Sequence, residues 1–156
     1  DSDGYYDGIF RIVGFSKKRR WGLAFCVWYW VFQPKPHDQY LFPYIGETPV
    51  SRKVKEFNHV DDIFEEVLEI SNASDGKRTI GQELWYLIPL FANPQYLLND
   101  ESFNLINEYH YIIDYHIPLG RTLDETDAHK LEYFTIIKNE MGVALKHRQD
   151  KHDIKK

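Results

Sequence analysis

Histidines and carboxylates stand four residues apart at two places in the second half of the sequence, and such pairs can bind metal ions. One pair is His110 and Asp114, and the other is Glu125 and His129. Residues four apart share one face of a helix, and two antiparallel helices joined near residue 118 would bring both pairs to the same end. Two imidazoles and two carboxylates can hold a divalent metal, which would suit a metal-dependent phosphoester hydrolase.

Other features of the sequence favour a protein without catalytic activity. The chain has seven histidines and 24 acidic residues, so the spacings above also arise by chance. It contains no glycine-rich phosphate loop, HExxH, GxSxG or CxxC motif. Its single cysteine, Cys26, lies in an apolar run, where a thiol keeps its proton and is a poor nucleophile. We therefore predict no cofactor and keep a divalent metal as the alternative.

Acidic residues are concentrated in the middle of the chain. Residues 61–120 hold eleven acidic and two basic residues, whereas the net charge of the whole chain is −5. Nucleic-acid-binding proteins normally carry a basic excess, so this distribution favours a basic protein partner. We predict a protein-interaction or regulatory domain that presents an acidic helix face to that partner. The predicted contact residues are Asp61, Asp62, Glu65, Glu66 and Glu69.

Four consecutive basic residues suggest a second alternative, contact with nucleic acid. They are Lys17, Lys18, Arg19 and Arg20, and Trp21 follows them directly. Cations at a hairpin tip can contact phosphates while a neighbouring aromatic ring stacks on a base. One basic turn on an acidic protein is weak support for this function, and a solvated loop is the simpler interpretation.

The apolar run of residues 20–32, RWGLAFCVWYWVF, must anchor the fold that positions these groups. Both alternating sides of the run are apolar, which is typical of a strand covered on two faces. Its aromatic and β-branched residues favour a strand, so with residues 9–15 it predicts an N-terminal antiparallel β-hairpin. A buried helix over residues 22–32 is the alternative. The run is too short to cross a membrane as a helix, which needs about 20 residues.

Beyond residue 57 the apolar residues recur at helical spacing. Pro89 is expected to interrupt the second of these helices, and residues 147–156 form a basic tail without periodicity. The predicted helical segments begin at Asn58, Thr79, Asn93, Asp100 and between residues 122 and 127.

Length and composition indicate one globular domain over residues 1–156, with a frayed N-terminus. A chain of 156 residues with 43% hydrophobic and 16% aromatic content can bury a core without disulfides or metals. The predicted fold class is α+β: an N-terminal antiparallel hairpin or small sheet packed against about four helices, with an all-α fold as the alternative. A single cysteine excludes an intramolecular disulfide, and we expect a cytoplasmic protein.

Overall fold

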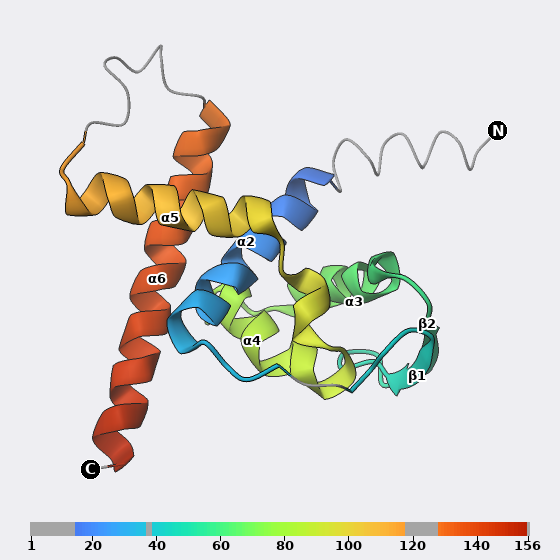
Figure 1. The fold of residues 1–156 in the computed structure, drawn as a ribbon. Helices are drawn as coiled ribbons and strands as arrows, with labels where there is room; N and C mark the ends of the chain where they lie inside the picture. The colour runs from blue at the N-terminus through green and yellow to red at the C-terminus, as the bar shows by residue number, and fades with distance from the viewer. Residues whose placement is uncertain (1–14, 37–38, 118–127, 156) are drawn as a thin grey trace.

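The computed structural model describes residues 15–36, 39–117 and 128–155, and most of these residues are helical (Figure 1). A central helix, α2, is surrounded by other helices, and a small hairpin lies at one end of the molecule (Figure 1). No described helix combines the length and the apolar character needed to cross a membrane. The elements are α2 (Phe15–Phe32), β1 (Tyr44–Glu47), β2 (Val54–Phe57), α3 (Val60–Ala73), α4 (Ile80–Phe91), the 3-10 helix η2 (Pro94–Leu97), α5 (Asp100–Asp114) and α6 (Ala128–Lys155).

The apolar run of residues 20–32 belongs to α2, so the prediction of a central strand is wrong and the alternative of a buried helix is right. Every residue from 21 to 28 is buried, because α4, α5 and α6 all pack against α2. A helix that is covered on all sides is apolar on all sides, and an alternating pattern cannot distinguish it from a buried strand. The other predicted strand, residues 9–15, lies outside the described residues except for Phe15, which is in α2.

The described sheet is a two-stranded antiparallel hairpin, and it lies after α2 rather than at the N-terminus. β1 and β2 pair Tyr44 with Phe57 and Glu47 with Val54. The rings of Tyr44 and Phe57 stack with centroids 5.0 Å apart, and Phe57 is fully buried. One face of the hairpin therefore packs on the core, and the α+β class holds in the coarse sense of a mostly helical protein with a small sheet.

Helices α3, α4 and α5 occupy stretches with predicted helical spacing. Asn93 caps η2, as predicted, because its side chain accepts a hydrogen bond from the backbone N–H of Gln95 at 3.0 Å. The predicted interruption at Pro89 is wrong, since α4 continues to Phe91. Proline costs one backbone hydrogen bond in a helix, and Pro89 loses it in the last turn, where the helix is about to end.

Helix α6 continues to Lys155, through residues where we predicted a tail without periodicity. Contacts with α2 hold this part of α6. The guanidinium of Arg148 donates a hydrogen bond to the carbonyl of Val31 at 3.3 Å, and the His147 ring lies 5.6 Å from the Trp28 ring. These tertiary contacts stabilise the helix at residues 147–148, where its own sequence pattern does not predict it.

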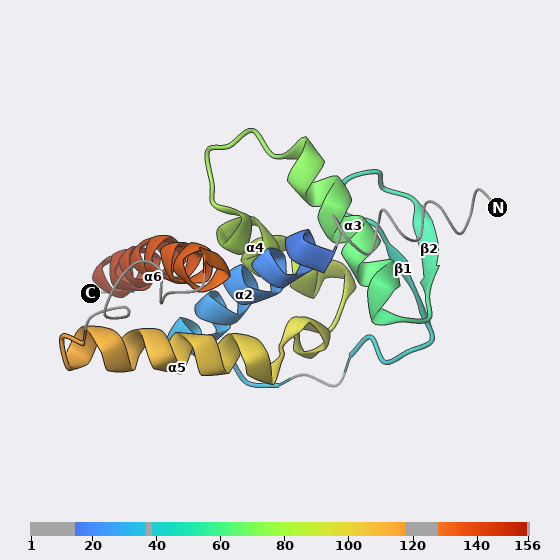
Figure 2. The same cartoon turned by 90° about the horizontal axis from the view of Figure 1, so that it is seen from above.

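Two apolar clusters flank α2. In Figure 2, α5 and α6 lie on one side of α2, and α3 and the hairpin lie on the other. Phe25 belongs to the cluster shared with α3, α4 and the hairpin. Trp28 belongs to the cluster shared with α5 and α6. α2 thus connects both halves of the core, which explains why its residues 21–28 are all buried.

Candidate functional site

Two of the five predicted acidic contact residues stabilise the local structure. The carboxylate of Asp62 accepts hydrogen bonds from the backbone N–H groups of Asn58 at 2.8 Å and His59 at 3.1 Å, and these bonds lower its pKa. This arrangement caps the N-terminus of α3. Glu66 is only 6% exposed and accepts a bond from Lys55 Nζ at 2.9 Å. Glu66 is thus buried inside the predicted face, whereas Asp62 is partly exposed.

The other three, Asp61, Glu65 and Glu69, are exposed and stand four residues apart along α3. Residues at this spacing form a line on one face of a helix, which we call the acidic ridge. The side chains of Asp61 and Glu65 are 77% and 61% exposed although each contacts a lysine. Glu69 forms no ion pair with the part of the chain that the structure describes. The ridge is therefore the portion of the predicted acidic face that remains open.

The basic residues Lys17–Arg20 lie in the first turns of α2 and not at a hairpin tip, because the predicted second strand, residues 20–32, is part of this helix. Three of them bind carboxylates of three other helices. Lys18 binds Asp61 of α3 at 2.8 Å, Arg19 binds Glu101 of α5, and Arg20 binds Glu132 of α6 at 3.0 Å. This cluster joins α2 to its neighbours, and two surfaces that we predicted as separate sites partly neutralise each other.

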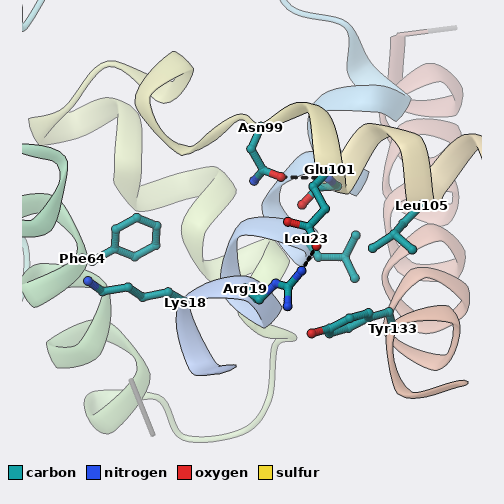
Figure 3. Close-up of a pocket in the computed structure, with 9 residues that line it drawn as sticks. Lys18, Arg19, Leu23, Phe64, Asn99, Glu101, Leu105 and Tyr133 are labelled. Atoms are coloured by element: carbon teal, nitrogen blue, oxygen red, sulfur yellow. Dashed lines mark hydrogen bonds and ion pairs between the residues drawn. The ribbon is translucent and has the colours of Figure 1, made fainter. Parts of the chain in front are cut away.

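A pocket of about 250 Å³ lies beside these ion pairs, between α2, α3, α5 and α6 (Figure 3). Figure 3 shows Arg19 turned toward Glu101, with Leu23, Leu105 and Tyr133 on one side and Phe64 on the other. Lys18 also lines the pocket and reaches over the Phe64 ring, with its Nζ 5.5 Å from the centroid. The two cations of the pocket are each engaged with a carboxylate, so the pocket carries little net charge of its own.

The predicted metal-binding residues are only partly described. His110 lies on α5, and its ring stacks on Trp30 with centroids 4.4 Å apart. Its Nε2 atom is buried without a hydrogen-bond partner, whereas Asp114 is exposed. Glu125 and the side chain of His129 lie outside the described residues. Within the described ranges no three His, Cys, Asp or Glu side chains gather as metal ligands do, and the four-residue group stays a prediction.

Cys26 is fully buried, as predicted. Burial raises the pKa of its thiol to about 11. The thiol is therefore protonated at neutral pH, and a protonated thiol is a weak nucleophile and metal ligand.

Sequence reasoning missed one buried carboxylate, Glu140 of α6, which is 3% exposed. It accepts hydrogen bonds from Trp28 Nε1 at 3.4 Å and from the backbone N–H of Gly81 at 2.9 Å. The second bond satisfies a free donor at the N-terminus of α4. Burial raises the pKa of Glu140 more than these bonds and one from Thr79 lower it. The sequence position of Glu140 could have revealed its burial. It lies three residues after Ile137 and four before Ala144, and both of these residues are fully buried.

No protein-family model, curated protein or solved structure matches this chain. The site must therefore be interpreted from its own residues. Their arrangement offers one exposed acidic line on α3, one charge-balanced pocket at the start of α2, and a buried carboxylate that links three helices.

Proposed function

We propose that this chain is a non-catalytic binding domain that presents the acidic ridge to a basic protein partner. The observation that carries the proposal is the exposure of Asp61, Glu65 and Glu69 in one line along α3. Around the ridge, residues 44–73 contain seven carboxylates and three lysine or arginine residues. A surface with this excess attracts basic partners over distances of about 8–10 Å at physiological salt.

Both lysines that contact the ridge are compatible with this role. Exposed ion pairs contribute only about 0–1 kcal/mol, so a partner's arginine or lysine can replace Lys18 at Asp61 at small cost. The ammonium group of Lys55 binds both Glu65 and Glu66, so it can remain bound to Glu66 when Glu65 binds a partner. The protonated thiol of Cys26 supports a domain without cysteine-based catalysis. A chain with one cysteine is suited to a reducing compartment such as the cytoplasm.

The test is a quantitative pull-down from lysate with three tagged proteins. They are the wild type, the ridge variant Asp61→Asn/Glu65→Gln/Glu69→Gln, and a control variant Asp100→Asn/Asp114→Asn/Asp150→Asn that removes the same charge from exposed sites on α5 and α6. Asp62 and Glu66 are left intact because they support the fold.

The proposal predicts a basic protein that binds the wild type and the control, survives nuclease treatment and dissociates at high salt. The ridge variant should retain about a tenth of that binding or less, since several charge contacts are lost together. Equal recovery by the wild type and the ridge variant would contradict the proposal. Material that disappears with nuclease would favour the nucleic-acid alternative and Lys17–Arg20.

A metal-dependent phosphoester hydrolase is the second candidate, and one observation favours it. The Nε2 atom of His110 is buried without a hydrogen-bond partner, and a ligating imidazole nitrogen must keep its lone pair available. The remaining ligands would be Asp114, Glu125 and His129. A thermal shift on adding Zn²⁺ or Mn²⁺ that is lost in His110→Ala would support this candidate, and no shift with any divalent metal would oppose it.

A further inference from the structure

The outer face of the hairpin is both apolar and acidic. Successive strand residues point to opposite faces of a sheet. The face opposite Tyr44 and Phe57 therefore carries every second residue of β1 and of β2. In the register of the hairpin, Ile45 lies opposite Glu56 and Glu47 opposite Val54. All four side chains are exposed. The face is thus a small square in which the two apolar residues occupy one diagonal and the two carboxylates the other.

Val54 and Ile45 are the two most exposed large hydrophobic side chains that the structure describes, at 77% and 70%. Single exposed apolar residues are common on protein surfaces, but these two are diagonal neighbours on one face of a sheet, so one extended segment can cover both. The opposite face is held by the stacked rings of Tyr44 and Phe57. The fold therefore does not need Ile45 or Val54 for its core.

The charges around this face determine what can cover it. Glu56 forms no ion pair with any described residue, and Glu47 has only an exposed arginine, Arg52, at 3.8 Å. A cation placed over this face would be attracted to both carboxylates. β2 also packs against α3, so the acidic ridge lies on the element next to the hairpin (Figure 2). An acidic or neutral apolar surface would fit this face poorly.

We propose that the outer face of the hairpin, formed by Ile45, Glu47, Val54 and Glu56, is the docking site for a basic segment of the protein partner in which lysine or arginine residues flank apolar ones. This inference rests on the proposed function and adds specificity to it. The acidic ridge accelerates association through long-range attraction, whereas Ile45 and Val54 provide the desolvated contact that slows dissociation.

Two fluorescein-labelled peptides of equal length and charge test the inference. In one, lysine alternates with valine, and in the other lysine alternates with serine. Fluorescence anisotropy measures their affinity for the wild type and for Ile45→Thr/Val54→Thr, which keeps the β-branched shape suited to a strand and removes apolar surface. The matched control is Ile113→Thr, the same change at a side chain on α5 that is 52% exposed.

The wild type and the Ile113→Thr control should bind the lysine-valine peptide about tenfold more tightly than the lysine-serine peptide, the gain expected for burying two apolar side chains in part. In Ile45→Thr/Val54→Thr the two affinities should become equal. Equal affinity of the wild type for both peptides, or an unchanged preference in the double variant, would overturn the inference.

Two further measurements separate this inference from the proposed function and from another occupant. If the ridge variant Asp61→Asn/Glu65→Gln/Glu69→Gln binds the lysine-serine peptide as well as the wild type does, the proposed function fails, while a retained preference for valine still supports the hairpin face. Sedimentation velocity reports on self-association. A dimer of the wild type that is lost in Ile45→Thr/Val54→Thr would show that a second copy covers the face and would overturn the inference.

Discussion

A buried carboxylate and a line of exposed carboxylates lie in opposite environments in this protein. Glu140 is buried between α2, α4 and α6 and accepts hydrogen bonds from Trp28 and Gly81. The acidic ridge on α3 is exposed, and its ion pairs with Lys18 and Lys55 lie at the surface. The same functional group is therefore enclosed by protein hydrogen-bond donors in one place and exposed to solvent in the other.

The difference follows from solvation. A buried carboxylate loses its hydration and is tolerated only when protein donors replace water. The buried N–H groups that donate to the carboxylate would lose their acceptor if the carboxylate were removed. An exposed carboxylate keeps its water, and its ion pairs are weak and screened by salt. Burial should thus determine how far each substitution affects unfolding.

The largest effect is expected for Glu140→Ala. This change leaves the N–H groups of Trp28 and Gly81 without their acceptor and opens a cavity between three helices, so the free energy of unfolding should fall by roughly 2–4 kcal/mol. Urea unfolding followed by tryptophan fluorescence measures it. If Glu140→Ala lowered the free energy of unfolding only as much as substitution of an exposed ridge carboxylate does, burial would not explain the difference between these carboxylates.

Gly81→Ala should have the next largest effect. A Cβ at this position would meet the Glu140 carboxylate and would lie 2.7 Å from Trp28 Cδ1. Both neighbours are buried and hydrogen-bonded, so neither can move freely, and overpacking should cost about 1–3 kcal/mol. The same urea experiment measures this loss.

Gly142→Ala is the matched control for Gly81→Ala. Gly142 lies on α6, and among the described residues no other segment comes within 4 Å of the added Cβ, so the change should raise stability by about 0.5–1 kcal/mol because alanine favours a helix. If Gly81→Ala were stabilised like Gly142→Ala, the close packing of Glu140 and Trp28 against Gly81 would not exclude a side chain at this position.

The part of this arrangement that could be predicted from the sequence is local. The helical spacing of Ile63 and Val67 predicted the inner face of α3, and both are fully buried. The apolar surroundings of Cys26 predicted its burial. The rule that acids opposite an apolar stripe face solvent was right for the exposure of Asp61, Glu65 and Glu69 and wrong for Glu66, which is buried. Whether a partner binds the acidic ridge remains a prediction.

What could not be predicted depends on contacts between distant segments. α2 was predicted as a strand because its own residues favour a strand, and only the packing of α4, α5 and α6 around it explains the helix. The pairing of Lys18 with Asp61, 43 residues apart, needs the fold to be known. The same is true of Glu140 and Trp28, 112 residues apart.

A dependence on pH would sharpen the comparison. Burial raises the pKa of Glu140 above its ordinary value of 4.5, so the folded state favours the protonated form more than the unfolded state does. The associated stabilisation is present below pH 4.5 and is lost as the pH rises through the folded-state pKa. Relative to Glu140→Gln, the wild type should therefore be more stable at pH 4 than at pH 7.

Unfolding of both proteins in urea at the two pH values measures this difference, since contributions from all other titrating groups are shared. If the stability of the wild type relative to Glu140→Gln stayed constant, the hydrogen bonds to the charged carboxylate would balance its burial. If it rose with pH, those hydrogen bonds would outweigh the burial.

The smallest effects on stability are expected on α3, where two adjacent carboxylates share Lys55. Glu65→Ala should reduce the free energy of unfolding by about 0.5 kcal/mol or less, because its side chain is 61% exposed. Glu66→Ala should cost about 1–2 kcal/mol, because this carboxylate is 6% exposed and its bond to lysine is shielded from water. Partner binding should show the reverse order, with Glu65→Ala weakening it more than Glu66→Ala. If the two variants ranked in the same order for stability and for binding, burial would not separate the structural carboxylates from the recognition carboxylates, even on a single helix.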